Sequence, residues 1–249
     1  MAKFLFVTDL DNTLVGDDDA LEQLNQQLLQ HREEHGTVIV YATGRSLPLF
    51  EELRSEKPLI EPDLRVLAVG TEIYRQDGDT PDPTWASQLN HRWDREKVRA
   101  IAAQFNDLTP QSQSEQGPFK ASYFLEEAAS KEVLACLEAE LKDQGLDAQL
   151  VYSSGHDLDI LPKRANKGAA VAFLQQSLQI PKERTVVCGD SGNDLSMFQA
   201  NHSRGIIVGN AQPELLNWHH ENPSGDRYLA QSHCAGGILE GLKHFGFIS

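Results

Sequence analysis

Two aspartates separated by one residue come directly after an apolar run near the start of the chain. Asp9 and Asp11 follow residues 4–7, a run that is typical of a buried parallel strand. As the chain leaves such a strand, both carboxylates can point into the crevice beyond the edge of the sheet. An isolated Asp-x-Asp is more often a turn or a helix cap than a catalytic pair, so a catalytic interpretation needs further polar groups at the same place.

Three further apolar runs end in polar residues, and a lysine opens a predicted helix of the core. The runs end at residues 43–45 (Thr-Gly-Arg), 70–72 (Gly-Thr-Glu) and 189–194 (Gly-Asp-Ser-Gly-Asn-Asp), and the lysine is Lys167. Converging carboxylates would repel each other and lose hydration, which a divalent cation relieves. Oxygen ligands without His or Cys favour Mg²⁺, which binds a few carboxylates together with a substrate phosphate. These residues therefore predict a Mg²⁺ site in this crevice.

Alternating apolar runs and amphipathic helices are expected to position these residues. Strands are predicted at residues 4–7, 38–42, 66–69, 185–188, 205–208 and 227–230, with helices between them. This alternation is typical of an α/β fold with a doubly wound parallel sheet, whose ligands lie beyond the carboxyl ends of the strands. A helix near residues 238–245 is expected to complete the core.

The segment between the two halves of the core has a different pattern. A loop rich in turn-forming residues begins at Asp77. It is followed by a predicted helix at residues 94–105, a strand at 120–125, a helix capped by Ser130, and strands at 149–153 and 158–161. We therefore expect a core domain formed by residues 1–78 and 163–249, with an inserted α+β cap domain at residues 79–162.

The set of motifs resembles the four ordered motifs of the haloacid dehalogenase phosphatases. The resemblance rests on residues 9–13 (Asp-Leu-Asp-Asn-Thr), Thr43, Lys167 and residues 189–194. It implies a Rossmann-like core, and it implies that Asp9 is the nucleophile that forms an aspartyl-phosphate. The neighbouring Asp11 would protonate the leaving alcohol and then activate the hydrolytic water.

The same resemblance implies roles for the remaining core residues. Thr43 and Lys167 would hold the phosphoryl oxygens. The implied Mg²⁺ ligands are Asp9, Asp11 through its backbone carbonyl, and Asp190, and the residues that orient them are Ser191, Asn193 and Asp194. Asp9 must be ionised to attack and Asp11 protonated to donate, so their surroundings should separate their pKa values.

Within these phosphatases, the inserted segment resembles the mixed α/β cap of the subgroup that acts on sugar phosphates. Such a cap closes over the site and contacts the leaving group. Stretches that resemble sucrose-phosphatases are residues 41–46, 56–58, 69–74, 152–162 and 210–216. The resemblance implies hydrolysis of sucrose-6-phosphate to sucrose and phosphate, the last step of sucrose synthesis. Plant members carry a further C-terminal domain, whereas this chain is expected to stop at the complete core, as cyanobacterial members do.

Substrate-binding residues are expected on both sides of the crevice. A disaccharide presents many hydroxyls, which a polar surface recognises by hydrogen bonds. The cap candidates are Lys120, Tyr123, Ser154, Gly155, His156 and Asp157, and the core candidates are Thr43, Gly44, Arg45 and Glu72. Lys120 and the loop at residues 154–157 are expected to bind the glucosyl unit. Arg45 and Glu72 either contact the fructosyl unit or form a salt bridge across the crevice.

Composition limits the partners. The net charge of −15 argues against nucleic acid, because binding to a phosphate backbone needs clustered Lys and Arg. No stretch approaches the roughly 20 apolar residues of a membrane span, and the first residues do not resemble a signal peptide. Three widely spaced cysteines without a CxxC pair indicate neither a disulfide framework nor a zinc site. A cytoplasmic monomer is expected, with a sugar phosphate as its substrate and at most a transient contact with a sucrose-phosphate synthase.

Three other functions stay open from the sequence. A phosphatase for another sugar phosphate, of the trehalose, glucosylglycerol or mannosylglycerate type, would use the same core chemistry. A phosphomutase would return the phosphoryl group to its substrate and release no phosphate. A catalytically silent, phosphate-binding regulatory module is disfavoured, because it would lack the nucleophile or a metal carboxylate. The chain has all four of these aspartates: Asp9, Asp11, Asp190 and Asp194.

Overall fold

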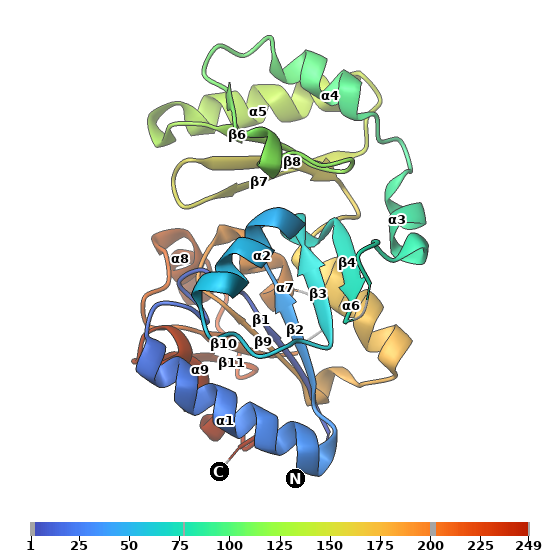
Figure 1. The fold of residues 1–249 in the computed structure, drawn as a ribbon. Coiled ribbons are helices and arrows are strands. Elements are labelled where there is room, and N and C mark those ends of the chain that lie inside the picture. The colour runs from blue at the N-terminus through green and yellow to red at the C-terminus, as the bar shows by residue number, and fades with distance from the viewer. Residues whose placement is uncertain (1–2, 77, 200–202, 249) are drawn as a thin grey trace.

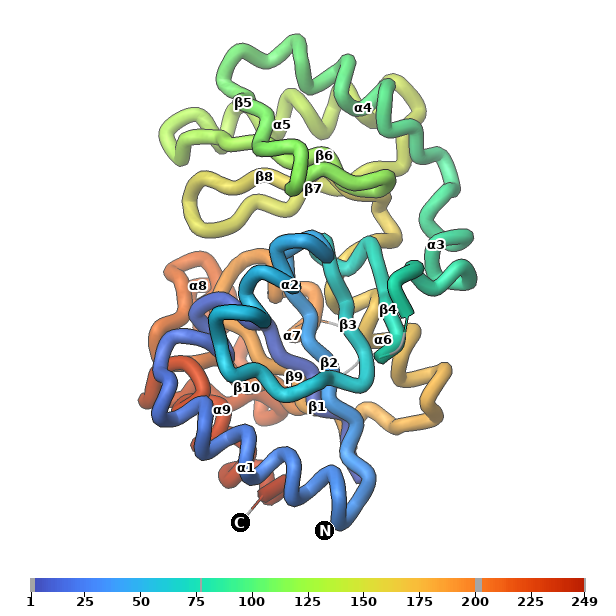
Figure 2. The backbone as a smooth tube through the Cα atoms, in the orientation of Figure 1, coloured from blue at the N-terminus to red at the C-terminus, as the bar shows by residue number. Residues whose placement is uncertain are grey.

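Figure 1 shows the computed structural model of the chain, which describes residues 3–76, 78–199 and 203–248. A larger unit, the core, contains both ends of the chain, and a smaller unit, the cap, is formed by the middle of the chain and lies above it. Two connecting segments join the units, one after α3 (Pro83–Leu89) and one before α6 (Lys167–Leu178), as Figure 2 shows. Asp77, at which the predicted loop begins, lies outside the described residues.

The core is built on a seven-stranded sheet with β1 at its centre. The strand order is β11-β10-β9-β1-β2-β3-β4. The strands are β1 (Leu5–Thr8), β2 (Val38–Ala42), β3 (Leu64–Leu67), β4 (Glu72–Arg75), β9 (Thr185–Gly189), β10 (Arg204–Ile207) and β11 (Arg227–Leu229). β1 pairs in parallel with both β2 and β9. The carboxyl ends of these three strands therefore bring Asp9, Thr43 and Asp190 to one edge of the sheet.

One strand departs from the predicted parallel sheet. β4 is absent from the sequence prediction, and it pairs with β3 in the antiparallel direction. The chain passes from β3 to β4 through the short 3₁₀ segment Ala68–Gly70, whereas a parallel connection needs a crossover of about a dozen residues or more. Glu72, a predicted site residue, therefore begins an antiparallel edge strand.

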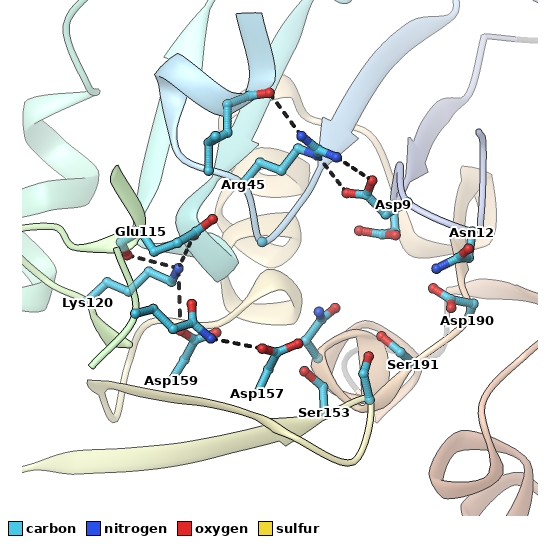
Figure 3. Close-up of a pocket in the computed structure, with 16 residues that line it drawn as sticks. Asp9, Asn12, Arg45, Glu115, Lys120, Ser153, Asp157, Asp159, Asp190 and Ser191 are labelled. Atoms are coloured by element: carbon cyan, nitrogen blue, oxygen red, sulfur yellow. Dashed lines mark hydrogen bonds and ion pairs between the residues drawn. The ribbon is translucent and has the colours of Figure 1, made fainter. Parts of the chain in front are cut away.

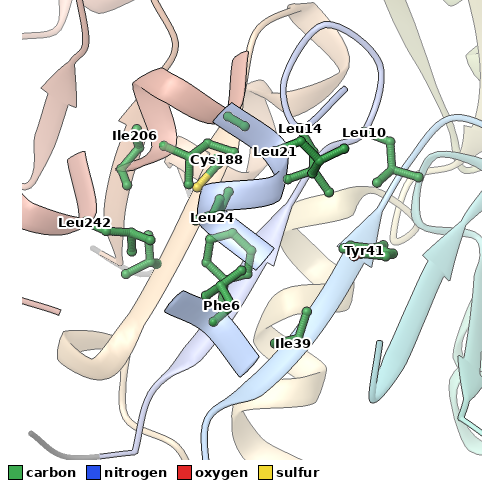
Figure 4. Close-up of a cluster of buried hydrophobic side chains, with 14 of the residues drawn as sticks. Phe6, Leu10, Leu14, Leu21, Leu24, Ile39, Tyr41, Cys188, Ile206 and Leu242 are labelled. Atoms are coloured by element: carbon green, nitrogen blue, oxygen red, sulfur yellow. The ribbon is translucent and has the colours of Figure 1, made fainter. Parts of the chain in front are cut away.

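Helices cover both faces of the core sheet. One face carries α1 (Asp18–His35), α2 (Leu47–Glu56) and α9 (Cys234–His244), and the other carries α3, α6, α7 (Leu195–Gln199) and α8 (Pro213–Glu221), with short 3₁₀ segments at Lys182–Arg184 and Gly192–Asp194. Side chains alternate along β1, so Phe6 packs on the first face while Leu5 and Val7 pack on the second. Figure 4 shows the first cluster, where Phe6 lies among Leu24 and Ile39. In the described part of the chain, no helix has the length and apolar character needed to cross a membrane.

The cap is a four-stranded antiparallel sheet with helices on one face. Its strand order is β5-β6-β8-β7. Its elements are β5 (Thr109–Pro110), β6 (Ala121–Phe124), β7 (Ala148–Ser153), β8 (Asp157–Pro162), α4 (Arg95–Ala102), α5 (Glu127–Asp143) and a 3₁₀ segment at Gln113–Glu115. Val98, Leu137 and Leu158 belong to the hydrophobic cluster between the sheet and the helices. The opposite face of the sheet is turned toward the core (Figure 1).

Two helix starts differ from the sequence prediction. α5 begins at Glu127 with Glu126 at its N-cap. The interpretation of Ser130 as the cap is wrong, since Ser130 lies in the first turn and its hydroxyl donates locally to the carbonyl of Glu127 (2.8 Å). α3 was not predicted, although Asp82 provides the side-chain cap and Pro83 the first residue that favour a helix start there.

α3 packs with the core. Trp85 and Leu89 lie in the same hydrophobic cluster as Leu5, and the indole N–H of Trp85 donates to the carbonyl of Gly70 (3.1 Å). Trp93 is the first residue along the chain that packs in the cluster of the cap. The placement of the cap domain at residues 79–162 stays a prediction.

Candidate active site

A polar pocket lies between the carboxyl ends of the core strands and the cap sheet. Its volume is about 420 Å³. Its lining residues are Asp9, Asp11, Asn12, Gly44, Arg45, Leu49, Asp190, Ser191 and Asn193 from the core, and Gln111, Glu115, Lys120, Ser153, Ser154, Asp157 and Asp159 from the cap. Figure 3 shows how the labelled members of the two sets surround the pocket. The structure thus brings most of the predicted core residues together with part of the predicted cap residues.

Lys167 is the centre of a buried charge network next to the pocket. It opens α6, which the side chain of Asn166 caps. Its ammonium lies 2.6 Å from Asp9 Oδ1, Asn193 Oδ1 and Asp194 Oδ1. Burial lowers the pKa of Lys167, but the carboxylates of Asp194 and Asp9 outweigh burial and raise this pKa above its usual range. Lys167 is therefore a fixed positive charge beside the predicted nucleophile.

Three core carboxylates converge at this edge of the sheet. Oxygen atoms of Asp9, Asp190 and Asp194 lie within 4.8 Å of one another. Asp194 Oδ2 accepts from the backbone N–H groups of Asp190 (2.9 Å) and Ser191 (3.1 Å), while its Oδ1 accepts from Lys167. One oxygen of Asp194 thus holds the loop and the other accepts from Lys167, whereas Asp9 and Asp190 line the pocket and are better placed to hold an ion.

Burial raises the pKa of two of these carboxyls. The pKa of Asp9 rises to about 7, because burial outweighs the nearby charge of Lys167. The pKa of Asp190 rises to about 8, because the charges of Asp194 and Asp9 add to the effect of burial. For Asp9 a raised pKa opposes the predicted role, because a nucleophilic carboxylate must be ionised. A divalent cation favours the ionised forms, and the all-oxygen cluster is compatible with a metal ion.

Arg45 forms a bidentate ion pair with Asp11. The Arg45 Nε and Nη2 atoms each lie 2.8 Å from one oxygen of Asp11, which is the fork geometry that matches a carboxylate. The hydrogen bonding to Asp11 raises the pKa of Arg45. The expected alternative of a salt bridge between Arg45 and Glu72 is wrong. Glu72 begins the edge strand β4 and accepts from the hydroxyl of Tyr74 (2.8 Å).

Thr43 is fully buried at the end of β2. Its hydroxyl accepts from the N–H of Arg45 (3.1 Å), and its carbonyl accepts from the N–H of Val69 (3.1 Å). Val69 has a φ of 58°, which is unusual for a β-branched residue. Such strained conformations often occur at functional sites. The sequence analysis missed this support of Thr43, because nothing at residue 69 marks a left-handed conformation.

The cap contributes a second buried lysine. The ammonium of Lys120 lies 3.1 Å from both the carbonyl and Oε2 of Glu115, and 3.4 Å from Asp159 Oδ1. Burial lowers the pKa of Lys120, but the Asp159 and Glu115 carboxylates outweigh burial and raise it. The hydroxyl of Ser122 also donates to Asp159 Oδ1 (2.6 Å). The predicted lysine therefore reaches the pocket as part of a network of paired groups.

The end of β7 and the start of β8 supply further cap groups. Asp157 lines the pocket and accepts from the side-chain amide of Gln111 (2.8 Å). Ser154 lines it together with Ser153. The sequence analysis missed Gln111, Glu115, Ser153 and Asp159. The alternation of side chains along β8 could have identified Asp159 from Asp157, whereas Gln111 lies in a connection without such a pattern.

Tyr123 lies outside the pocket, and the structure corrects its placement. It is packed in the hydrophobic cluster of the cap, with Val98 and Leu137. Successive side chains of a strand point to opposite faces. Because Ser122 faces the network of Asp159, its neighbour Tyr123 faces the helices.

Two further cap candidates lie at the turn but not in the lining. The ring of His156 is stacked parallel to that of Phe124, with 6.0 Å between the centroids, and its side chain is 52% exposed. Gly155 has a φ of 71° and gives the turn its left-handed conformation. Both residues are therefore close to the pocket without lining it.

Comparison with known proteins gives a consistent family. The chain matches the sucrose-6F-phosphate phosphohydrolase family over residues 2–246. It is 38% identical to sucrose-phosphatase 2 of Nicotiana tabacum over 253 residues, covering 98% of this chain and 59% of the tobacco protein. The chain thus spans about three fifths of the length of that plant relative. It is 37% identical to mannosylfructose-phosphate phosphatase of Agrobacterium fabrum, covering 97% of this chain and 96% of that protein.

A solved structure agrees with this assignment. The X-ray structure of the sucrose-phosphatase from Synechocystis sp. PCC6803, in complex with sucrose and phosphate, is 45% identical to this chain. The two folds superpose with a TM-score of 0.92 over 99% of each chain. The resemblance predicted from the sequence is therefore confirmed, and the chain belongs to the sucrose-6F-phosphate phosphohydrolase family.

Proposed function

We propose that this chain is a phosphoric monoester hydrolase that converts sucrose-6-phosphate to sucrose and phosphate with Mg²⁺ as its metal ion. The observation that carries the proposal is the polar pocket in which the core carboxylates face the cap. The 45% identity to an enzyme solved with sucrose and phosphate supports the choice of substrate.

Asp9 and Asp11 divide the proposed chemistry. A carboxylate oxygen of Asp9 attacks phosphorus, the bond from phosphorus to the sugar oxygen breaks, and Asp11 gives its proton to that oxygen. Water then attacks the aspartyl-phosphate while Asp11 takes a proton from it, and phosphate leaves as Asp9 is restored. Lys167 and Thr43 hold the phosphoryl oxygens, where fixed donors stabilise the transition state.

The ion pair of Asp11 with Arg45 adds a condition to this scheme. Both oxygens of Asp11 accept from the guanidinium. Asp11 must therefore give up at least one of these bonds before it can carry the proton for the leaving group. Arg45 thus positions Asp11 at the mouth of the pocket.

The core carboxylates fit a bound Mg²⁺. The proposed ligands are Asp9, Asp190 and the backbone carbonyl of Asp11, and the residues that orient them are Ser191, Asn193 and Asp194. The ion, when bound, neutralises the carboxylates and polarises a phosphoryl oxygen. The raised pKa values of Asp9 and Asp190 support this assignment, because they show how strongly burial opposes ionisation of these two groups on their own.

The cap, proposed to comprise residues 79–162, recognises the sugar. Lys120, Ser154 and Asp157 supply donors and acceptors for the glucosyl unit, and Gly44 and Arg45 face the fructosyl unit from the core. The other candidates for sugar binding, Glu72, Tyr123, Gly155 and His156, are assigned no contact with the sugar, since they lie outside the lining. A monomeric state and a transient contact with a sucrose-phosphate synthase stay predictions.

Release of inorganic phosphate tests the proposal. It is measured with Mg²⁺ and with chelator, from sucrose-6-phosphate, trehalose-6-phosphate, fructose-6-phosphate and glucose-6-phosphate, with Asp9→Asn as the control. We expect metal-dependent release with kcat/KM at least about 10-fold higher for sucrose-6-phosphate, since one lost polar contact costs about that much. The activity should vanish in Asp9→Asn. A preference for another ester would overturn the substrate, and no release from any ester would overturn the phosphatase.

A second substrate is favoured by one observation. The Agrobacterium relative, which this chain covers almost completely, is a mannosylfructose-phosphate phosphatase. Sucrose and mannosylfructose both contain a fructosyl unit. The cap side of the pocket must therefore distinguish a glucosyl from a mannosyl unit. Mannosylfructose-phosphate therefore belongs in the same set of substrates, and a higher kcat/KM for it than for sucrose-6-phosphate would reverse the assignment.

A further inference from the structure

We propose that Glu214 is a positioning residue that joins the cap to the loop carrying Asp190, so that the two walls of the pocket are held together around the sugar phosphate. The inference rests on the proposed function, and it concerns a residue outside the pocket lining. Glu214 lies in the first turn of α8 and is half-buried.

One carboxylate oxygen of Glu214 accepts from both units. Its Oε1 lies 3.1 Å from the backbone N of Ser154 in the cap and 3.2 Å from the backbone N of Gly192 in the core. Figure 1 shows the turn between β7 and β8 directly above α8. Among the described residues, no other hydrogen bond crosses between cap and core outside the two connecting segments.

The backbones of the two units also touch at Gly192. A Cβ atom at this position would lie 2.7 Å from the carbonyl oxygen of Tyr152 in β7 and 3.3 Å from Cγ of Glu214. The nearer contact leaves no room for a side chain, because it is made with a backbone atom. Glycine at residue 192 therefore allows the end of β7 to rest on the core loop, with Glu214 beside the contact.

Glu214 is held in a fixed position relative to Asp190 of the core. The backbone N–H of Gln212, which precedes α8, donates to the carbonyl of Asp190 (2.7 Å). Leu215 is fully buried in the core cluster and anchors the start of the helix. A cap group bound to Glu214 is thus held in a set position relative to Asp190.

The two hydrogen bonds of Glu214, to Ser154 in the cap and Gly192 in the core, form a bridge where both walls contribute to the pocket. Ser153 and Ser154 line it from the cap, and Asp190, Ser191 and Asn193 line it from the core. If the cap moves away, the bond from Ser154 to Glu214 breaks, while the bond from Gly192 can persist. Glu214 therefore stabilises the enclosed arrangement selectively, and enclosure excludes water and completes the site.

Substrates with and without a sugar separate this role from a purely structural one. In Glu214→Ala, we expect kcat/KM for sucrose-6-phosphate to fall about 10-fold, as for loss of one charge-assisted hydrogen bond. Hydrolysis of p-nitrophenyl phosphate, which offers the cap no sugar to enclose, should fall far less. Glu214→Gln keeps an acceptor oxygen and should restore most of the loss. The matched control is Glu221→Ala, an exposed glutamate on the same helix.

Hydrogen exchange tests the bridge independently of activity. The amide of Ser154 should exchange faster in Glu214→Ala than in the wild type, and at the wild-type rate in Glu221→Ala. Equal losses for both substrates, or unchanged exchange at Ser154, would overturn the inference. A wild-type protein that hydrolyses no sugar phosphate would overturn the proposed function instead, while the exchange measurement would still decide whether Glu214 joins the two units.

Discussion

One buried lysine lies in the cap wall of the pocket and another lies next to its core wall, and the surroundings of the two lysines differ. Lys167 in the core lies 2.6 Å from carboxylate oxygens of both Asp9 and Asp194. Lys120 in the cap lies 3.1 Å from Glu115 and 3.4 Å from Asp159. The core contacts are shorter, and the carboxylate side chains of Asp9 and Asp194 are almost fully buried, whereas the side chain of Glu115 is 25% exposed.

The difference lies in how the surplus of carboxylates is compensated. In the cap, Ser122 donates to Asp159 and Gln111 donates to Asp157, while burial raises the pKa of Asp157. In the core, burial raises the pKa of Asp9 to about 7 and that of Asp190 to about 8, in spite of Lys167 and of the Thr13 hydroxyl that donates to Asp190. The core wall therefore suits a cation and a phosphoryl group, and the cap wall suits the hydroxyls of a sugar.

Removal of the two lysines in turn is expected to give the largest effects. Lys167→Met leaves Asp9 and Asp194 without their cation, which should lower the free energy of unfolding in chelator by about 3–5 kcal/mol. It should also reduce phosphate release from every ester by at least about 100-fold, as for loss of one fixed transition-state donor. Lys120→Met should reduce phosphate release from sucrose-6-phosphate more than phosphate release from fructose-6-phosphate. Urea unfolding and phosphate release measure these effects.

Lys167→Arg is the control, because it keeps the positive charge and changes the geometry of the charged group. It should regain part of the stability and little of the activity, because a planar guanidinium cannot replace the compact ammonium between three acceptors. If Lys120→Met reduced the turnover of both sugar phosphates equally, the division of roles between the two walls would be wrong.

The second effect concerns Mg²⁺ and pH. Folding raises the pKa of Asp9 to about 7 and of Asp190 to about 8, from 3.8. Between about pH 4 and pH 8 the folded chain thus binds protons that the unfolded chain has lost, so these groups make the metal-free protein less stable as the pH rises. Mg²⁺ binds the ionised forms, so it should stabilise the protein more at pH 8 than at pH 6. The gain should reach about 2.7 kcal/mol at 100 times its dissociation constant.

Thermal unfolding with Mg²⁺ and with chelator measures this effect. Asp190→Asn serves as the control, because it removes one titrating ligand. In this variant Mg²⁺ should stabilise the protein much less, and its stabilisation should differ less between pH 6 and pH 8 than in the wild type. Equal stabilisation at both pH values would mean that Asp9 and Asp190 are not the groups that the ion binds.

A smaller effect is expected from Asp157 in the cap. Asp157→Ala removes a carboxylate that lines the pocket and leaves the amide of Gln111 without its acceptor. The ratio of kcat/KM for sucrose-6-phosphate to that for fructose-6-phosphate should fall about 10-fold, or about 1.4 kcal/mol. His156→Ala removes an exposed ring whose Nε2 lies 3.6 Å from Asp157 Oδ2 but leaves that carboxylate in the pocket, so it should change the ratio by less than about 2-fold. Full discrimination in Asp157→Ala would remove Asp157 from the sugar site.

The two walls also differ in how far the sequence predicted them. Parallel strands deliver their carboxyl ends to one edge, so Asp9, Asp190 and Arg45 could be placed in one crevice from their positions alone. Lys167 followed from its occurrence together with the other motifs of the resemblance, because a lysine at the start of a helix is by itself more often exposed to solvent. The contact of Arg45 with Asp11 could not be predicted, since it depends on the side-chain directions of two loops.

In the cap, the choice of face limited the prediction. The four residues of β6 do not show which face of the strand is covered by the cap helices. Tyr123 was therefore placed on the wrong face. Gln111 comes from a connection and meets Asp157 across 46 positions in the chain. Only the packed sheet brings such residues together.

The smallest effect is expected for Tyr123 itself. Tyr123→Phe keeps the ring in the hydrophobic cluster with Val98 and Leu137 and removes only the hydroxyl. Because this side chain faces the helices, the ratio of kcat/KM for sucrose-6-phosphate to that for fructose-6-phosphate should stay within about 2-fold of the wild type, well below the cost of one lost polar contact. Steady-state phosphate release, beside Asp157→Ala, measures it. A 10-fold fall in Tyr123→Phe with Asp157→Ala unchanged would mean that the cap turns its other face to the substrate, and that Asp157 and Lys120 do not form the sugar-binding wall.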